Sequence, residues 1–218
     1  MNPAAEDYLK MIYEMSGGNL SQPVKLSELA ERFGYTVQSV NEMVRRIQDK
    51  GLLAFMPYKG VTLTDAGLKE AVRMIRVHRV WEVFLSEKLH LRWDELHEEA
   101  EQLEHATSPL VLEKLYTYLG EPKYCNHGNP IPNQLGEMAP RADGHLYDAP
   151  VGQRFMIQRV LDHKPLLAHL YERGLSLGDE LIIIDKDTLN GLIHVKKADS
   201  IHVLGKSVAT MIFGKKQT

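Results

Sequence analysis

The sequence predicts a mainly α-helical chain with small β elements, arranged as successive folded parts. Apolar residues recur at helical spacing through most of residues 4–119, which predicts helices there. Short β-like runs split by Gly and Asp follow residue 150, which predicts a small β-barrel. A Pro- and Gly-rich stretch separates the two regions. We divide the chain into residues 1–73, 74–134 and 150–218, with a linker at 135–149.

Bulk composition indicates an ordinary globular protein. Of its 218 residues, 44% are hydrophobic and 25% are charged. Cys125 is the single cysteine, so no intramolecular disulfide can form, which fits a reducing compartment. The N-terminal residues lack the basic and apolar regions of a signal peptide, and no apolar run reaches the roughly 18 residues of a membrane span. We expect a cytoplasmic protein with no membrane partner.

Charge is divided unevenly along the chain. Residues 25–76 hold nine Lys or Arg against six Asp or Glu, while residues 82–104 hold two against eight. The overall net charge of −3 hides this division. A basic segment is typical of nucleic-acid binding, and an acidic segment that also carries histidines is the part to search for a cation site.

The first expected helix spans residues 4–15, with Leu9, Ile12 and Tyr13 at helical spacing. Asp7 lies beside this apolar face. Its local context leaves two interpretations open. It is either a first-turn carboxylate stabilised by the helix dipole or a residue with a functional role.

Residues 25–52 predict two short helices joined by a tight turn. Ser27 and Thr36 are the expected N-caps, and Gly51 ends the second helix. A basic, amphipathic second helix indicates a helix-turn-helix, although a plain helical hairpin with a solvated polar face fits the same pattern. The side chains expected to face duplex DNA are those of Thr36, Gln38, Ser39, Asn41, Glu42, Arg45 and Arg46.

The stretch that follows predicts a wing. Leu53–Met56 and Val61–Thr64 are β-like runs on either side of a Tyr58-Lys59-Gly60 turn, and a hairpin after a helix pair makes a winged helix. Lys59 at the tip is expected near a DNA phosphate. Thr64 then caps a helix of roughly 24 residues, about 36 Å long.

Histidines and glutamates recur at helical spacing in the acidic segment. The helix expected over HEEAEQLEH places four side chains on one stripe: His97, Glu101, Glu104 and His105. One helix earlier, an i, i+4 pair repeats the spacing: His78 and Glu82. Burying such a stripe is costly unless a divalent cation neutralises it. We therefore predict two packed helices that hold metal; the alternative is a solvated face in a metal-independent winged-helix regulator.

A metallohydrolase is a second alternative. HEEAE begins like an HExxH zinc helix, but Glu101 stands where the second histidine is needed. We also expect protein ligands to fill the candidate sites, which leaves no obvious position for a catalytic water. We expect no enzymatic activity and no small organic substrate.

The loop at 120–134 brings together Cys125 and His127. A thiol and an imidazole two residues apart in a turn can face one ion, and a loop pair without a role fits equally well. The segment Trp81–Leu119 carries more apolar surface than one thin layer needs. Because a helix-turn-helix protein usually reads two half-sites as a dimer, we expect a homodimer that forms through this segment.

Six features follow one another along the chain: EDYLKMIYE (6–14), the winged helix with LTDAG, HRVWE (78–82), HEEAEQLEH (97–105), GNPIP (128–132) and the C-terminal barrel. In this order they resemble the metal-dependent repressors of the diphtheria-toxin-repressor and manganese-transport-regulator family. The resemblance covers nearly the whole chain. It identifies the C-terminal barrel with that family's SH3-like (FeoA-like) domain.

The resemblance implies the metal ligands. One site would be formed by Asp7, Glu101, Glu104 and His105, with His78 close by. A second would be formed by Glu82, Cys125, His127 and Asp162, and His97 matches a ligand of the iron-responsive branch. In this family the bound metal drives tight binding to double-stranded operator DNA. The resemblance therefore implies a homodimeric repressor of metal-uptake genes.

Two departures bear on the choice of metal. The iron-responsive branch has Met where Asp7 stands and Cys where Glu101 stands, and oxygen donors suit Mn²⁺ better than that softer set. Lys10 stands where the short manganese regulators have a Glu ligand, which argues against a two-manganese cluster of their kind. We expect Mn²⁺ as the ion. An iron-dependent repressor with Fe²⁺ is the alternative within the family, and Zn²⁺ is a further ion expected to bind in vitro.

Overall fold

The computed structural model describes residues 2–217, and the chain folds as two compact units. The first unit comprises the residues up to Val77 together with Glu104–Thr107 and Pro132–Glu137. The second comprises His78–Leu103, Ser108–Ile131 and the residues from Met138 onward. Each unit encloses a buried apolar cluster of its own. Among the described residues, no helix has both the length and the apolar character needed to cross a bilayer.

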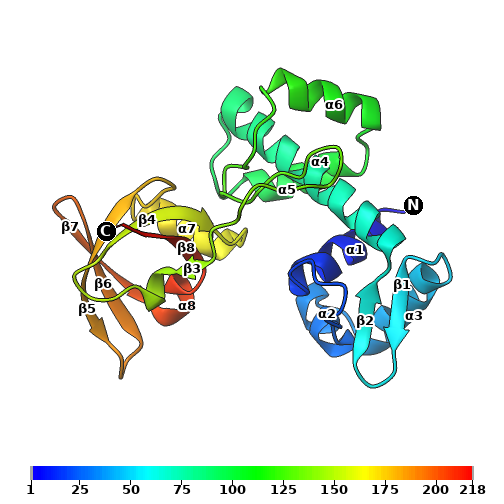
Figure 1. Ribbon diagram of the computed structural model, residues 1–218, viewed down its shortest axis with the longest axis horizontal. Helices are drawn as coiled ribbons and strands as arrows, with labels where there is room; N and C mark the ends of the chain where they lie inside the picture. Colours follow the sequence, from blue (N-terminus) through cyan, green and yellow to red (C-terminus); the bar gives the residue numbers. More distant parts are fainter. Residues whose placement is uncertain (1, 218) are drawn as a thin grey trace. The chain divides into compact units, whose positions relative to one another are not determined.

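The first unit contains a winged helix-turn-helix (Figure 1). Its elements are α1 Pro3–Met15, α2 Leu26–Phe33, α3 Val37–Gln48, β1 Leu53–Met56, β2 Gly60–Leu63 and the start of α4 Asp65–Leu89. The two strands pair antiparallel, with Leu53 opposite Leu63, and β2 begins one residue earlier than expected. The predicted inner faces of the helices are confirmed, because Leu9, Ile12 and Val44 are fully buried.

Local capping sets the helix ends of this unit. The hydroxyls of Thr36 and Thr64 each accept a backbone hydrogen bond from the residue three positions on, which confirms both predicted N-caps. The prediction for Ser27 was wrong. The N-cap of α2 is Lys25, whose backbone N–H donates to Glu28 Oε2 at 3.4 Å, so Ser27 lies inside the helix.

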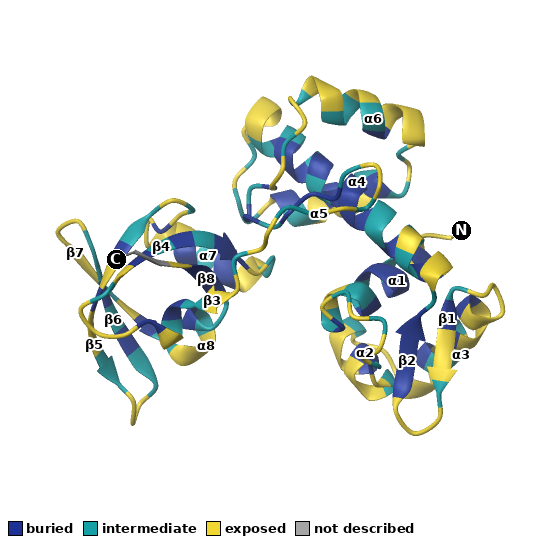
Figure 2. Cartoon of the chain, viewed as in Figure 1, coloured by how far each residue is buried: buried dark blue, intermediate teal, exposed yellow. Residues whose placement is uncertain are grey.

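The second unit combines helices with an antiparallel sheet (Figures 1 and 2). Its helices are the rest of α4, α5 Leu96–Glu104 up to Leu103, α6 Pro109–Tyr118, α7 Lys164–Glu172 and α8 Lys206–Ala209. The sheet order is β3 Gly144–His145, β8 Ile212–Gln217, β4 Arg154–Val160, β5 Glu180–Asp187, β6 Leu192–Lys197 and β7 Ser200–Gly205. Alternate strand residues such as Phe155, Leu181 and Val195 are buried in one cluster, as the period of two requires.

Part of the stretch expected to be a linker is folded. Within residues 135–149, β3 pairs with β8, and the 3₁₀ helix η1 Leu146–Asp148 follows directly. Leu146 and Ala149 are fully buried in the cluster beneath the sheet. The sequence did not predict these elements, because a two-residue strand is too short to show a periodic pattern.

Gly60 allows the wing to approach the segment before α2. Its φ is +124°, and a Cβ at this position would lie 2.0 Å from the carbonyl oxygen of Val24. Val24 and Val61 exchange two backbone hydrogen bonds of 2.9 Å, which tie the hairpin to this segment. The glycine is therefore required by both its backbone angle and the close contact.

We predict that Gly60→Ala lowers the free energy of unfolding by about 3 kcal/mol, because the substitution strains the backbone and separates Val24 from Val61. Urea unfolding followed by circular dichroism measures the change. Gly51→Ala is the matched control, since Gly51 also has a positive φ but no atom lies within 4 Å of its Cβ position. The control should lose only about 1 kcal/mol, and equal losses would contradict the contact argument.

Candidate metal centres and DNA-binding surface

The first cluster joins two segments of the chain within the first unit. Asp7 lies on α1, Glu104 is the last residue of α5, and His105 follows it. His105 Nε2 lies 3.0 Å from Asp7 Oδ1 and 3.7 Å from Glu104 Oε1. The ligand atoms of the three residues all lie within 4.8 Å of one another. Ligands bonded to one ion at about 2.0–2.3 Å lie at most about 4.6 Å apart, so small adjustments would let the three share a divalent cation.

Glu6 holds the ring of His105 from its other side. Glu6 Oε2 lies 2.7 Å from His105 Nδ1, and Glu6 Oε1 accepts a hydrogen bond of 2.9 Å from Arg73. Because an ionised carboxylate can only accept, Nδ1 carries the proton of this bond and Nε2 is presented to Asp7. Glu6 thus has the position of the outer-sphere carboxylates that orient metal-binding histidines.

Lys10 neutralises part of the same cluster. Its ammonium group lies 2.7 Å from Glu104 Oε1, and both side chains are buried, with 7% and 0% of their surface exposed. α1 therefore contributes a candidate ligand, Asp7, and two charged neighbours of the other candidate ligands. Glu6 and Arg73 were not predicted from the sequence. The sequence feature that could have indicated Glu6 is its i, i+4 spacing to Lys10, with Asp7 between the two residues.

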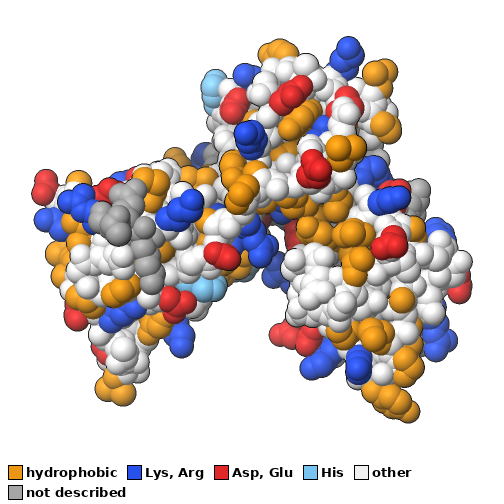
Figure 3. Space-filling view, in the orientation of Figure 1, with side chains coloured by type: hydrophobic (Ala, Val, Ile, Leu, Met, Phe, Trp, Pro, Cys, Tyr) orange, Lys and Arg blue, Asp and Glu red, His pale blue; other side chains and the backbone are white. Residues whose placement is uncertain are grey.

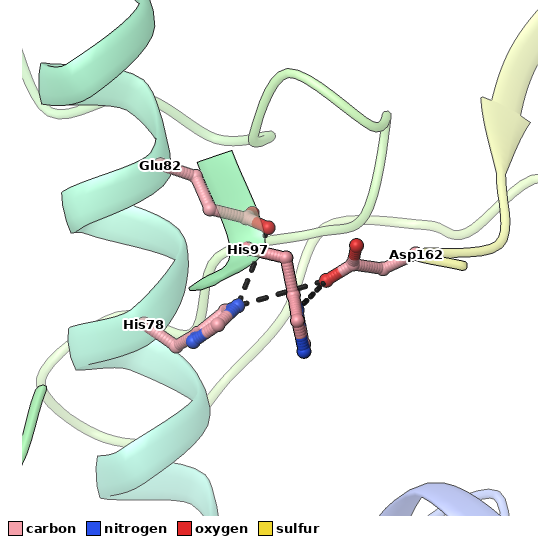
Figure 4. Close-up of side chains that lie close together, drawn as sticks. All are labelled: His78, Glu82, His97 and Asp162. Carbon is pink, nitrogen blue, oxygen red and sulfur yellow. Dashed lines mark hydrogen bonds and ion pairs between the residues drawn. The ribbon is translucent and has the colours of Figure 1, made fainter. Parts of the chain in front are cut away.

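The second cluster lies in the second unit (Figure 4). His78 and Glu82 are one turn apart on α4, His97 is at the start of α5, and Asp162 follows β4. All four side chains point toward one another (Figure 4). Asp162 Oδ2 lies 2.6 Å from His97 Nδ1 and 3.6 Å from His78 Nε2, and Glu82 Oε1 lies 3.3 Å from His78 Nε2. Their ligand atoms form one group within 4.8 Å.

Cys125 and His127 adjoin this cluster through Glu82. The three residues form a second group within 4.8 Å, and all three are buried. His127 Nε2 lies 3.3 Å from the carbonyl oxygen of Trp93, to which it can donate, and Nδ1 lies 3.0 Å from Glu82 Oε1. The loop that carries them is held against β4, because His127 O accepts a hydrogen bond from Val160 N at 2.9 Å.

Gly128 makes the close approach of this loop possible. Its φ is +77°, and a Cβ would lie 2.0 Å from the carbonyl oxygen of Gln158. The backbone N–H of Gly128 donates to the Cys125 carbonyl, and that of Cys125 donates to the Asn129 carbonyl. The turn thus presents the thiol and the imidazole to the same carboxylate.

Histidines compensate the carboxylates of the second unit. Burial would lower the pKa of His97, but hydrogen bonds to Asp162 and Glu101 raise that pKa to about 9. Burial and the charge of Glu82 would raise the pKa of Asp162, yet hydrogen bonds from His78 and His97 hold it at about 2. The two shifts show that protonated histidines and ionised carboxylates stabilise each other in this cluster.

The shared carboxylate and the thiol respond to the same environment. Desolvation would raise the pKa of Glu82, but the charge and hydrogen bond of His127 hold it well below its usual range. Burial raises the pKa of the Cys125 thiol, and the neighbouring Glu82 charge adds to that effect. The Cys125 thiol must therefore release its proton when it binds a metal ion.

Two residues are placed differently from what the resemblance implied. Glu101 is exposed on α5, and its Oε1 lies 3.3 Å from His97 Nε2. It belongs to the second unit and is not a member of the group formed by Asp7, Glu104 and His105. His78, expected near the first site, groups with Glu82, His97 and Asp162.

The exposed side of α3 carries the residues expected to face DNA. Val40, Val44 and Ile47 are buried, while the other side is exposed except for the half-buried Asn41: Thr36, Gln38, Ser39, Glu42, Arg45 and Arg46. Lys59 is exposed at the turn of the hairpin. On the face of the molecule shown in Figure 3, Lys and Arg side chains lie scattered among acidic and hydrophobic ones. The fold and the two clusters define a class: winged-helix DNA-binding proteins with sites for divalent cations.

Three family models match successive parts of the chain. Residues 1–61 match the iron dependent repressor N-terminal DNA binding domain, residues 64–133 match the iron dependent repressor metal binding and dimerisation domain, and residues 145–216 match the FeoA domain. The chain is 30% identical over 182 residues to the iron-dependent repressor IdeR of Mycobacterium leprae, covering 78% of each chain. It is 35% identical over 119 residues to an uncharacterized HTH-type transcriptional regulator of Methanocaldococcus jannaschii, covering 55% of this chain and 94% of the relative.

Solved structures extend the similarity to the full length. A manganese-dependent transcriptional repressor in complex with manganese matches with a TM-score of 0.88 and 32% identity, covering 98% of this chain and 100% of that one. The manganese regulator SloR matches with a TM-score of 0.84 and 33% identity over all of both chains. The chain belongs to the iron-dependent repressor family of metal-dependent, DNA-binding transcriptional repressors, and it is not an enzyme.

We predict that Glu6→Gln weakens the binding of a divalent cation at the first cluster by about 10- to 100-fold, because the loss of charge releases the His105 ring. Calorimetric titration measures this, with the affected step identified as the one that Asp7→Ala removes. Glu14→Gln, exposed on the same helix, is the control and should bind like the wild type. Unchanged affinity in Glu6→Gln would show that Glu6 does not orient the ligand.

Proposed function

We propose that this protein is a manganese-responsive repressor in which a divalent cation at the first cluster switches DNA binding. The observation that carries the proposal is the approach of Asp7, on the first helix of the DNA-binding domain, to Glu104 and His105 within ligand reach. These residues are almost a hundred positions apart in the sequence. A cation that binds all three links the DNA-binding domain to the metal-binding and dimerisation domain.

The donor atoms favour a hard ion. Asp7 and Glu104 offer carboxylate oxygens and His105 offers one imidazole nitrogen, a set that suits Mn²⁺. Raw affinity still rises from Mn²⁺ through Fe²⁺ to Zn²⁺ at any such site, so selectivity depends on coordination number and on which metal the cell supplies. The manganese-dependent proteins among the structural relatives support this choice.

The switch follows from linkage between metal and DNA. A cation shifts the population toward the DNA-binding arrangement only through its higher affinity for that arrangement. The ion pairs Lys10–Glu104 and Glu6–His105 already connect α1 to the C-terminal end of α5 and the residue after it, so the metal would complete an arrangement that side chains hold in part. A coupling free energy of about 1–3 kcal/mol, or 5- to 150-fold in affinity, is enough for regulation.

DNA binding is assigned to α3 and the wing. The exposed polar side of α3 would enter the major groove, with Gln38, Asn41 and Arg45 positioned to reach bases or phosphates. Two such helices are needed for two half-sites. The exposed apolar residues of α6 support that helix as part of the dimer surface: Leu110, Val111 and Tyr118 (Figure 2).

Asp7→Ala should abolish the stimulation of DNA binding by Mn²⁺, because it removes the only candidate ligand that the described residues of α1 contribute to the first cluster. Binding is measured by fluorescence anisotropy at fixed salt, with an operator selected from random duplexes in the presence of Mn²⁺. Sedimentation should show an intact dimer in the variant, and Glu14→Ala should respond to Mn²⁺ normally. Wild-type protein that binds the operator equally well with and without Mn²⁺ would refute the proposal.

Lys59→Ala tests the placement of the wing. If the Lys59 ammonium contacts a phosphate, its loss should weaken binding to all sequences alike and reduce the slope of log affinity against log salt by about 1. Lys25→Ala, an exposed lysine before α2, is the control for a general change in charge. An unchanged slope in Lys59→Ala would place the wing away from the backbone.

A further inference from the structure

Six possible ligands in the second unit are arranged around two centres. His78, Glu82, His97 and Asp162 form one group whose ligand atoms all lie within 4.8 Å of one another. Cys125 and His127 form another group, and Glu82 is the member that the two groups share. Ligands of a single ion lie at most about 4.6 Å apart, so the six side chains as placed do not surround one position.

We propose that the second unit binds two divalent cations side by side, with the carboxylate of Glu82 bridging them. One ion would take His78, His97 and Asp162 together with Glu82, and the other would take Cys125 and His127 together with Glu82. This inference deepens the proposed function and rests on it. It raises the number of ions from two to three per chain.

Glu82 has the geometry of a bridge. Its Oε1 lies 3.3 Å from Nε2 of His78 in one group and 3.0 Å from Nδ1 of His127 in the other. The side chain is only 1% exposed, so it faces these rings and not solvent. In two-metal sites, ions about 3.5–4 Å apart are commonly clamped in this way by shared oxygen ligands.

Asp162 has one oxygen directed to each centre. Its Oδ2 lies 2.6 Å from His97 Nδ1 and 3.6 Å from His78 Nε2. Its Oδ1 is buried, accepts no hydrogen bond from any residue between 2 and 217, and lies 3.9 Å from His127 Nδ1. A buried carboxylate oxygen without a donor is costly, and a cation at the second centre would satisfy it.

The two centres differ in chemistry. The group with His78 and His97 offers only nitrogen and oxygen atoms, whereas the group with Cys125 also offers sulfur. Thiolate ligands favour softer ions than carboxylates do, so the second centre has the stronger preference for Zn²⁺ or Fe²⁺ over Mn²⁺. With three protein ligands it also leaves a position for a water molecule or for Asp162 Oδ1.

Cobalt loading of the full-length protein tests the proposal. After removal of metal with a chelator, the protein is dialysed against Co²⁺, and the bound ion per chain is measured by elemental analysis. The near-ultraviolet absorption from thiolate to Co²⁺ reports separately on the Cys125 centre. We expect three ions per wild-type chain, one of them at the first cluster.

Single variants separate the centres. His97→Ala should lose one ion and keep the thiolate absorption, Cys125→Ala should lose a different ion together with that absorption, and Glu82→Ala should lose two. Asp7→Ala should lose one ion and leave the thiolate absorption intact. Glu99→Ala, exposed on the same helix as His97, is the control and should keep all three ions. Circular dichroism identifies any variant that fails to fold, and His97→Gln then replaces His97→Ala.

Two ions in the wild type, with His97→Ala and Cys125→Ala each reducing the number to one, would overturn the proposal, because a single ion would then use both groups. Electron paramagnetic resonance of the Co²⁺-loaded protein gives a second readout. A bridged pair produces an exchange-coupled signal that either variant removes, and isolated-ion spectra throughout would overturn the proposal. Failure of the proposed function would appear differently, as operator binding that ignores Mn²⁺ while the number of ions stays at three.

Discussion

Histidine rings facing carboxylates are the interaction on which both candidate metal centres depend. His105 lies between Glu6 and Asp7, and His97 lies between Asp162 and Glu101. An ionised carboxylate accepts hydrogen bonds only, so a ring nitrogen that faces one carries either a proton or a metal ion. Protons and divalent cations therefore compete for the same atoms, and metal binding must release protons.

Because of its residue spacing, the first helix combines part of the winged-helix core with a candidate metal ligand. Leu9 and Ile12 are buried in the core of the winged helix, while Glu6, Asp7 and Lys10 approach the residues at the end of α5. A rigid helix transmits any constraint at Asp7 to the packed core that positions α3. This coupling needs no long-range pathway, since the ligand and the core residues belong to one element.

Periodicity in the sequence predicted much of this arrangement and failed where long-range packing decides. The pair His78 and Glu82 was found from its i, i+4 spacing on a helix, and α4 presents both to one cluster. The His97–His105 stripe was also found, but its residues do not form one site. His97 belongs to one compact unit and His105 belongs to the other. Helical spacing shows which residues share a face, but it does not show where the neighbouring elements divide that face.

Helical spacing could not identify some residues of the candidate metal sites. Asp162 is 65 residues from His97, so only the family resemblance pointed to it. Glu6 contacts the candidate ligand His105, and Arg73 contacts Glu6. Motifs that are defined by metal-binding atoms do not identify such supporting residues. The winged helix was easier to predict than the metal sites, because helix caps and buried helix faces depend on local sequence. The strand β3 was too short to be recognised.

The side chains that pair with the carboxylates differ between the two clusters, and this difference bears on the number of ions that we propose for each. At the first cluster, Lys10 occupies one oxygen of Glu104 and Arg73 neutralises Glu6, so fixed cations already balance two of the carboxylates. Within residues 2–217, the ion pairs of Glu82 and Asp162 are formed with histidines instead. A lysine or arginine stays protonated and excludes a second ion, whereas a histidine can give up its proton and become a ligand. This difference supports the proposed single ion at the first cluster, where lysine and arginine balance the carboxylates, and the proposed pair of ions in the second unit, where imidazoles do.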